Sequence, residues 1–358
     1  MRKKVMFLLP SVRGGGAERV MVNLLNTLDR EKFDLSLALV SKVGPFLNDI
    51  PSDVKLHDLQ ALRVRNVFVP LIKLIWKTKP DVLVSTQGYL NIAVLLARFM
   101  MPRRLKIIVR EGSIVSEKLP TIRFTGLWKT LYRTLYKRAD RVVCQSNYML
   151  KDLYDNFETP LNKLVQIYNP VNIGDINKRA GEGSNPFHDH PQSFNIVTVG
   201  RLSRVKRHDR MIESMPGLLK IKPNAKLWIV GTGELENELV MLRDRLHLQD
   251  YVFFAGFQNN PYIWMKNADL FLLTSDYEGL PNVVLEAVAC NCSVIVTDHP
   301  GGTREIFELM EQEERIVQEL EWKESWFVKP DETAMKLFTD TFSASVITRK
   351  YEKIFLEP

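Results

Sequence analysis

Two glutamates lie eight positions apart in the segment SDYEGLPNVVLEA. Glu278 follows an apolar run typical of a buried strand, and Glu286 lies in the first turns of a helix that we expect to begin near Asn282, a good N-cap residue. Carboxylates accept paired hydrogen bonds from the neighbouring hydroxyls of a sugar or a ribose. Alternatively, the pair could supply an acid and a base for glycoside hydrolysis. Either way, the segment predicts a carbohydrate or nucleotide site.

Two cations follow an earlier apolar run. In VGRLSRVKRHDR, Arg201 and Lys206 lie five residues apart, just after the strand expected at 194–200. Cations held at the carboxyl end of a strand would neutralise a diphosphate leaving group. Taken alone, the segment also fits an ordinary solvated basic loop.

Three consecutive glycines, Gly14, Gly15 and Gly16, separate the first apolar run from a helical pattern in SVRGGGAERV. Free backbone N–H groups at such a helix start could hold a phosphate. The dinucleotide fingerprint fits only loosely, because position 19 is Arg instead of a third glycine. A tight turn without a ligand is the alternative. We expect Glu18 to complement the helix dipole, and the role of Arg19 is open.

Apolar runs alternate with helical patterns throughout the chain, which predicts parallel α/β sheets. The expected strands are 4–9, 35–40, 82–86, 106–110, 141–145, 194–200, 226–231, 252–257, 270–275 and 293–297. The apolar residues at positions 17, 20, 21, 24, 25 and 28 share one helical face. The pattern runs twice, so we predict two tandem doubly wound domains with ligands at the carboxyl ends of their strands, in the cleft between them.

The predicted domains are 1–170 and 194–342, joined by a linker at 171–193 that is rich in Asn, Gly, Pro and Ser. His188 and His190 in this linker are expected to be solvated and not metal ligands. WFVKPDE is expected to supply a late strand and turn. The segment 343–358 predicts a helix that returns to the first domain.

Composition and charge limit the classes of protein. The chain is 45% hydrophobic and 25% charged, as in soluble globular proteins, and no apolar run is long enough to cross a bilayer. Three cysteines form no motif, so we expect a reducing, cytoplasmic compartment. Residues 1–170 hold 28 basic and 14 acidic residues, a net charge of +14, whereas residues 171–358 hold 21 and 28, a net charge of −7. The basic half predicts an anionic partner, such as a nucleic acid, a membrane or a phosphorylated substrate.

The segment TIRFTGLWKTLYRTLYKRADR interleaves cations with aromatic and aliphatic residues. Such a helix can lie on an anionic membrane, and Trp128, Arg133, Lys137 and Arg138 are the residues we expect to face it. An ordinary surface helix with its apolar side in the core is the alternative.

In combination, the glycine turn, the Arg201/Lys206 pair, the paired glutamates and the loop DHPGGTREI resemble retaining GT-B glycosyltransferases of family 4. Within this family, the sequence most resembles bacterial enzymes that build O-antigen, lipopolysaccharide, capsule or other lipid-linked glycans. The resemblance covers nearly the whole chain and is most specific at the paired glutamates. It implies two tandem Rossmann-like domains facing across a cleft, with the acceptor on the N-terminal domain and the nucleotide sugar on the C-terminal domain.

The resemblance also implies roles for particular residues. Arg201 and Lys206 would bind the diphosphate, Glu278 would contact the donor sugar, and these three would be the catalytic residues. Glu286 would hold the ribose. The other implied donor-binding residues are Gly15, Gly16, Gly279, Leu280, Pro281 and Asn282. Many family members carry a histidine where this chain has Gly112, so either Arg110 or Glu111 would contribute to the acceptor side instead, or this role is absent.

The function that the resemblance implies is transfer of a sugar, with retention, from a UDP- or GDP-linked donor to a hydroxyl of a lipid-linked glycan in polysaccharide biosynthesis. It implies no metal or other cofactor and a peripheral position on the cytoplasmic face of the inner membrane, on its anionic surface. We expect no nucleic acid partner. The alternatives are a basic nucleic-acid-binding protein, another two-domain sugar-nucleotide enzyme such as an epimerase or phosphorylase, and an NAD-dependent oxidoreductase, against which the missing third glycine argues.

Overall fold

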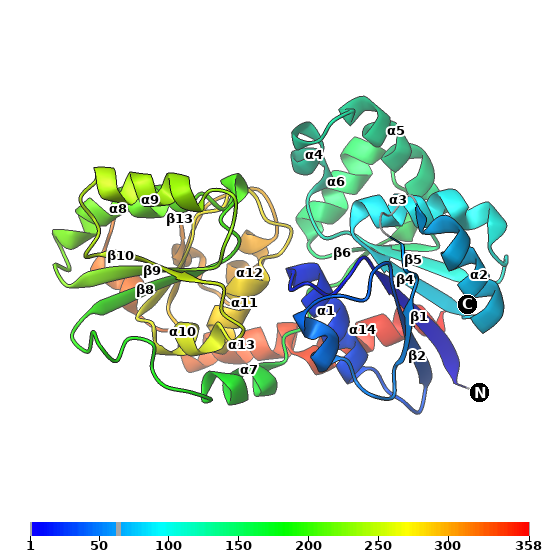
Figure 1. Cartoon of the computed structure of the whole chain (residues 1–358), viewed down its shortest axis with the longest axis horizontal. Helices are drawn as coiled ribbons and strands as arrows, with labels where there is room; N and C mark the ends of the chain where they lie inside the picture. The colour runs from blue at the N-terminus through cyan, green and yellow to red at the C-terminus, as the bar shows by residue number, and fades with distance from the viewer. Residues whose placement is uncertain (1, 62–65, 358) are drawn as a thin grey trace. The chain divides into compact units, whose positions relative to one another are not determined.

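The computed structural model describes residues 2–61 and 66–357, which form two compact units (Figure 1). Unit 1 comprises residues 1–170 and 344–358, and unit 2 comprises residues 171–343. Each unit contains one parallel sheet covered by helices. The predicted fold class, two tandem α/β domains with parallel sheets, is therefore confirmed.

The described residues of unit 1 form a seven-stranded parallel sheet with the strand order β3-β2-β1-β4-β5-β6-β7. Its strands are β1 (Lys3–Leu9), β2 (Phe33–Leu39), β3 (Lys55–Asp58), β4 (Val82–Thr86), β5 (Lys106–Arg110), β6 (Arg141–Cys144) and β7 (Leu164–Gln166). Its α-helices are α1 (Gly16–Thr27), α2 (Phe68–Thr78), α3 (Gly88–Leu96), α4 (Val115–Lys118), α5 (Thr125–Leu135), α6 (Asn147–Phe157) and α14 (Ala344–Leu356). Helices α1 and α14 pack together, and α3, α5 and α6 form a separate contacting group.

The described residues of unit 2 form a six-stranded parallel sheet with the order β10-β9-β8-β11-β12-β13. Its strands are β8 (Phe194–Val199), β9 (Ala225–Val230), β10 (Val252–Gly256), β11 (Leu270–Leu273), β12 (Val294–Thr297) and β13 (Ile316–Val317). Its α-helices are α7 (Ile173–Ala180), α8 (His208–Leu219), α9 (Glu236–Arg245), α10 (Tyr262–Asn267), α11 (Asn282–Ala289), α12 (Thr303–Leu309) and α13 (Glu332–Phe342). Helices α8 and α9 contact each other, whereas α7, α10 and α11 form another group.

In each sheet, the order in which the chain adds strands reverses at one point. The position of this switch point determines where a ligand can bind. The chain moves outward from β1 to β3 and then returns to β4 on the other side of β1. In unit 2 it moves from β8 to β10 and returns to β11 on the other side of β8. Loops that leave neighbouring strands on opposite sides diverge at such a switch point and open a crevice at the carboxyl ends. The loops after β1, β4, β8 and β11 are therefore the candidates for a site.

The predicted linker at 171–193 is wrong, because this segment is an ordered part of unit 2. Helix α7 occupies its first half, and Phe187 in its second half is buried. The Phe187 ring lies 5.4 Å from Trp228 and 5.5 Å from Trp264, centroid to centroid. A single aromatic residue in a polar segment thus has its partners on distant elements, which local composition does not reveal.

Three short strands escaped prediction. β3 and β13 are partly exposed, and β7 has only three residues, so none has the continuous apolar character of a central parallel strand. The late strand expected in WFVKPDE is also wrong. Residues Glu324–Phe327 form a 3-10 helix instead, and the last strand of the sheet, β13, lies before it.

The C-terminal helix α14 packs on unit 1. Phe355 is completely buried and makes edge-to-face contacts with Phe7 of β1 and Phe33 of β2, at centroid distances of 6.2 and 5.9 Å. The hydroxyls of Thr27 and Thr348 lie 2.6 Å apart. Unit 1 is therefore built from both ends of the chain.

Replacing Phe355 with alanine should lower the free energy of unfolding of unit 1 by about 3–5 kcal/mol, because the substitution leaves a cavity against β1 and β2. Leu356→Ala is the matched control, since Leu356 is 51% exposed, and we expect it to cost less than about 0.5 kcal/mol. Urea denaturation followed by hydrogen exchange in β1 measures both. Equal effects of the two substitutions would contradict the assignment of α14 to the core of unit 1.

Candidate active site

Three loops at the carboxyl end of the unit 2 sheet are joined by backbone hydrogen bonds. The loop after β11 is bonded to the loop after β8, where the Asp276 N–H donates to the carbonyl of Val205 at 2.8 Å. It is also bonded to the loop after β12, where the Glu278 N–H donates to the carbonyl of Pro300 at 3.1 Å. The three loops, of which those after β8 and β11 flank the switch point, therefore form one backbone framework.

Lys206 and Glu278 form the polar centre of this framework. Lys206 Nζ lies 2.5 Å from Glu278 Oε1, and the Ser275 hydroxyl donates to the same oxygen at 2.7 Å. The side chains of Lys206 and Glu278 are 22% and 14% exposed. Burial alone would raise the pKa of Glu278, but the charge and hydrogen bond of Lys206 and the Ser275 hydroxyl lower it below its ordinary value. Glu278 is therefore a carboxylate at neutral pH.

The other two predicted charged residues lie on the same two segments of the chain as this pair. Arg201 is exposed on the same loop as Lys206, and within residues 2–61 and 66–357 no salt bridge or hydrogen bond of its side chain is found. Glu286 is half-buried in the second turn of α11, where the Tyr262 hydroxyl lies 3.4 Å from its Oε1. The structure thus joins Lys206 and Glu278 directly and leaves the Arg201 guanidinium open to solvent.

The segment between the two glutamates is tightly held. Gly279, Leu280 and Pro281 are buried, and Pro281 takes the N-cap position, so Asn282 is the first residue of α11 and not its cap. The expected N-cap role of Asn282 is therefore wrong by one position.

The loops after β8 and β9 approach each other so closely that Gly231 must be a glycine. Gly231, after β9, has a φ of 143°, and a Cβ at this position would lie 1.9 Å from the carbonyl oxygen of Gly200. No other residue fits there without moving the loop that carries Arg201 and Lys206.

His299 and Ser275 are site residues that the sequence analysis did not nominate. The buried His299 ring lies 2.7 Å from the Thr297 carbonyl and 2.8 Å from the Thr303 hydroxyl. Burial lowers the pKa of His299 although the charge of Glu278 opposes this shift. The available signal was the position of the histidine in DHPGG, two residues after the end of a strand.

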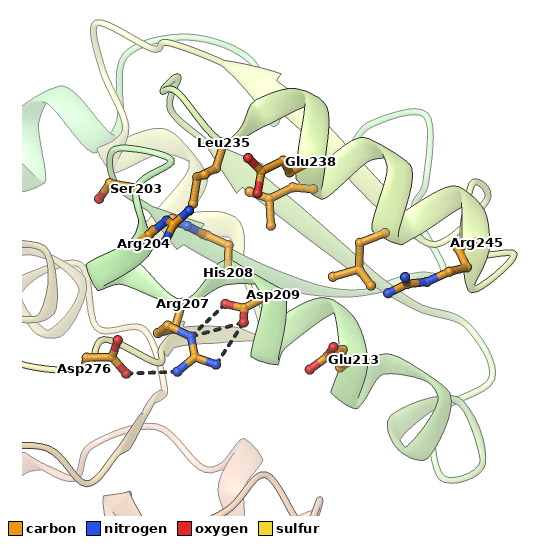
Figure 2. Close-up of a pocket in the computed structure, with 12 residues that line it drawn as sticks. Ser203, Arg204, Arg207, His208, Asp209, Glu213, Leu235, Glu238, Arg245 and Asp276 are labelled. Atoms are coloured by element: carbon orange, nitrogen blue, oxygen red, sulfur yellow. Dashed lines mark hydrogen bonds and ion pairs between the residues drawn. The ribbon is translucent and has the colours of Figure 1, made fainter.

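A cavity of about 500 Å³ adjoins this framework between α8 and α9 (Figure 2). Arg207, on the loop after β8, lies at the edge of this cavity. Its Nη2 is 2.9 Å from Asp209 at the start of α8, and its Nη1 is 3.1 Å from Asp276 on the loop after β11, so it links these two loops. Burial of the neighbouring His208, with the charge of Lys206, lowers its pKa to about 4, so its ring is neutral at neutral pH. Arg207 thus fixes the backbone next to Lys206.

In unit 1 the glycine turn forms the start of α1. Gly14 has a φ of 110°, which favours glycine, and the Gly15 N–H donates to Glu18 Oε2 at 2.5 Å. Glu18 therefore caps the helix and complements its dipole, as expected. Arg19, whose role was open, pairs with Asp49 at 3.0 Å. Gly16 begins the helix.

Glu111 and Arg110, the two residues expected on the acceptor side, are both buried. The hydroxyl of Tyr136 and, at 3.2 Å, the amide of Asn91 donate to Glu111 Oε1. Burial raises the pKa of Glu111 despite these bonds. The Arg110 side chain is completely enclosed, so it offers no atom to a ligand on the surface of unit 1.

The Arg110 guanidinium instead starts a chain of hydrogen bonds inside unit 1. It donates to Asn169 at 2.6 Å, Asn169 donates to Gln145 at 2.8 Å, and Gln145 donates to the carbonyl of Glu111 at 2.7 Å. Burial lowers the pKa of Arg110, and the Tyr351 hydroxyl of α14 lies beside it. These contacts fix the turn that follows β5.

The four residues expected to face a membrane lie in different surroundings. Trp128 is half-buried, and Arg138 is exposed. Arg133 and Lys137 lie 3.7 and 3.3 Å from the carboxylate of Glu158, which partly neutralises them. Among the described residues, no helix is both long enough and apolar enough to cross a membrane.

Comparison with known proteins places this chain in a family. Residues 14–175 match the model described as Glycosyltransferase Family 4, and residues 186–324 match Glycosyl transferases group 1. The chain is also 31% identical over 320 residues to a protein of Campylobacter jejuni, N-acetylgalactosamine-N,N'-diacetylbacillosaminyl-diphospho-undecaprenol 4-alpha-N-acetylgalactosaminyltransferase, covering 85% of this chain and 83% of that protein. The chain belongs to glycosyltransferase family 4. It is also 25% identical to the amylovoran biosynthesis glycosyltransferase AmsD of Erwinia amylovora, covering 85% of this chain and 83% of AmsD.

Solved structures agree on the fold of this glycosyltransferase. HepE of Anabaena, in complex with UDP and glucose, superposes with a TM-score of 0.79 at 19% identity over 100% of both chains. A glycosyltransferase of Rickettsia africae gives a TM-score of 0.78 at 16% identity over 99% of this chain and 98% of that one. These likenesses confirm the predicted GT-B fold.

The lowered pKa of Glu278 predicts a pH dependence of stability. Protonation of Glu278 removes its ion pair, so its contribution is present at neutral pH and is lost as the pH falls below its ordinary value of 4.5 and through its lower folded value. Glu278→Gln should reduce the fall in the free energy of unfolding of unit 2 over this pH range. Urea titrations between about pH 6 and pH 3 measure it. Glu308→Gln, which removes an exposed carboxylate, should keep the wild-type slope, and an unchanged slope in Glu278→Gln would refute the prediction.

Proposed function

We propose that this glycosyltransferase transfers a sugar from a UDP-sugar to a hydroxyl of a lipid-linked glycan, with retention of anomeric configuration and without a metal ion or other cofactor. The observation that carries the proposal is the Lys206–Glu278 pair at the switch point of unit 2, beside the exposed Arg201. A cation for the leaving diphosphate and a carboxylate for sugar hydroxyls lie there in direct contact.

The pair is suited to this task because each partner has bonding capacity left. Within the described ranges, Lys206 Nζ donates only to Glu278 Oε1, so two of its three N–H groups are available to diphosphate oxygens. Glu278 Oε2 has no hydrogen-bond donor among the same residues, so it can accept from a sugar hydroxyl. Lys206 fixes the orientation of the carboxylate while facing the leaving group itself.

The remaining donor contacts follow from the same loops. Arg201 adds a second cation for the diphosphate, and stabilising the charge that develops there lowers the barrier to departure. Glu286 is assigned to the ribose hydroxyls, and Gly279–Asn282 to the sugar and phosphate. In unit 1, Gly15 and Gly16 are assigned to the donor and Glu111 to the acceptor side.

The donor and acceptor classes are supported by the relatives. HepE was solved with UDP and glucose, which favours UDP over GDP. The Campylobacter jejuni relative is named for a diphospho-undecaprenol acceptor, and CapH of Staphylococcus aureus, 26% identical, is named for capsular polysaccharide biosynthesis. We therefore assign the protein a lipid-linked acceptor and a peripheral position on the cytoplasmic face of the inner membrane.

Lys206→Ala and Glu278→Gln should each reduce kcat/KM for sugar transfer by about 10²–10³-fold, because each removes a charge that acts on the transition state. Lys220→Ala, a substitution of an exposed lysine on unit 2, is the control and should keep full activity. The assay measures transfer from UDP-sugars to a lipid-linked acceptor with a chelator present throughout. NMR of the product should show the anomeric configuration of the donor. Near-normal turnover of Glu278→Gln, inversion, or loss of wild-type activity on chelation would each overturn the corresponding part of the proposal.

UDP should raise the thermal midpoint of the wild-type protein, because a ligand that binds only the folded state stabilises it. The shift should disappear in Glu286→Ala, which removes the carboxylate assigned to the ribose. GDP tested at the same concentrations is the comparison. A larger shift with GDP than with UDP would mean that the donor nucleotide contains guanine and not uracil. An unchanged shift in Glu286→Ala would remove that residue from the site.

A further inference from the structure

The turn after β4 contains a strained residue at the switch point of unit 1. Gln87, which directly precedes α3, has a φ of 75° and a ψ of 121°, and residues with a side chain rarely adopt such a positive φ. A conformation of this kind destabilises the fold and persists only where surrounding contacts impose it, most often where a ligand binds. The strain therefore points to a role for this turn beyond connecting β4 to α3.

Contacts on both sides of Gln87 impose this conformation. Before it, the hydroxyl of Thr86, the last residue of β4, accepts a hydrogen bond from the buried Arg110 guanidinium at 3.3 Å. After it, the backbone N–H of Asn91 donates to the Gln87 carbonyl at 2.9 Å, and the side-chain amide of Asn91 donates to the Arg110 carbonyl, also at 2.9 Å. The turn after β4 is thus fixed to the turn after β5, which carries Glu111.

The strained turn holds the side chains of Gln87 and Tyr89 together, and we call these two residues the Gln87–Tyr89 pair. The Tyr89 hydroxyl donates to Gln87 Oε1. Burial and the negative charge of Glu18 raise the pKa of Tyr89, so this hydroxyl keeps its proton at neutral pH. Within residues 2–61 and 66–357, the amide N–H groups of Gln87 have no acceptor, and Tyr89 is 38% exposed. The pair therefore offers two hydrogen-bond donors beside an accessible aromatic ring.

The Gln87–Tyr89 pair is close to both groups that the proposed function assigns to substrates on unit 1. Glu18, which caps the glycine turn after β1, is near enough for its charge to act on Tyr89. Gly88, between the two residues of the pair, lies against the acceptor-side turn, because a Cβ at Gly88 would be 3.2 Å from Glu111 Oε1. The pair is therefore next to the carboxylate assigned to the acceptor side.

The chemistry of the pair complements an acetamido group on a sugar. The carbonyl oxygen of that group only accepts hydrogen bonds, which the amide N–H groups of Gln87 would donate. Its methyl group and the apolar face of the sugar ring would pack on the Tyr89 ring, which supplies a large apolar surface with a polar tip. A hydroxyl at the same carbon would cover less of this ring and would leave a donor without its matched acceptor.

We propose that Gln87 and Tyr89 bind the terminal sugar of the acceptor and favour an acetamido sugar over a sugar with a hydroxyl at the same carbon. The inference rests on the proposed function and deepens it, because it gives the acceptor a sugar class and two binding residues. The strained backbone at Gln87 holds the two side chains in the arrangement that recognises this sugar.

The test compares acceptors on undecaprenyl diphosphate that end in N-acetylgalactosamine or galactose, and in N-acetylglucosamine or glucose, at saturating UDP-sugar. For the wild type, kcat/KM should be at least about tenfold higher with the acetamido member of a pair. Gln87→Ala should bring this ratio close to one. Tyr89→Ala should raise the acceptor KM at least about tenfold with little change in kcat, because it removes binding that is the same in the ground state and the transition state.

Tyr154→Ala is the matched control, since Tyr154 is another exposed tyrosine of unit 1, and it should keep the wild-type KM and the wild-type ratio. A wild-type preference for the hydroxyl member, an unchanged ratio in Gln87→Ala, or an equal rise of KM in Tyr154→Ala would overturn the proposal.

Two further measurements separate this inference from the proposed function and from a purely structural role. The UDP-induced thermal shift reports donor binding alone and should be the same in Gln87→Ala and the wild type. If the wild type shows the shift but no preference for acetamido acceptors, the acceptor assignment is refuted and the donor site stands. If the wild type shows no shift, the proposed function fails and this inference fails with it.

Gln87→Gly removes the amide and also relieves the backbone strain. It should raise the thermal midpoint of the protein without ligand by at least about 2 °C and should lose the preference for acetamido acceptors. A lower midpoint together with an intact preference would show that the turn has only a structural role.

Discussion

The contact between Lys206 and Glu278 is the interaction on which the proposed chemistry depends. A partly buried ammonium and carboxylate both lose hydration, and their attraction offsets that loss only when the geometry is well fixed. The geometry here comes from the backbone bonds that join the loops after β8, β11 and β12, and from Arg207, which links two of these loops. In the proposed function, the remaining N–H groups of Lys206 and Oε2 of Glu278 bind the donor at the switch point.

Unit 1 supports its candidate acceptor side in a related way. Arg110 and Glu111, adjacent in sequence, are both buried ionisable groups, and each is surrounded by hydrogen-bonding partners from distant segments. The chain of donors from Arg110 through Asn169 and Gln145 ends on the backbone of Glu111. Tyr351 of the C-terminal helix is buried beside Arg110, so residues from the end of the chain help to enclose this guanidinium.

Prediction from the sequence succeeded where burial leaves a continuous local pattern. The central strands β4 and β5 each contain a continuous apolar run and were located to the residue, and the buried face of α1 follows from its 3.6-residue period. It failed where few residues carry the signal. β3 has no buried residue and therefore no apolar face that a pattern could show. Phe187 packs on unit 2 through contacts with Trp228 and Trp264, and its neighbours in the sequence do not indicate these contacts.

By itself, the sequence determined the order of the strands that carry a continuous apolar run and the residue types at the ends of those strands. These are local properties, set by periodicity, glycine and charge within a few residues. Only the tertiary structure decided which of those residues meet. Lys206 and Glu278 are 72 residues apart, and they touch because β8 and β11 are neighbours in the sheet although two strands separate them in the chain. The enclosure of Arg110 and the pairing of Arg133 and Lys137 with Glu158 likewise depend on packing between distant segments, which no local pattern encodes.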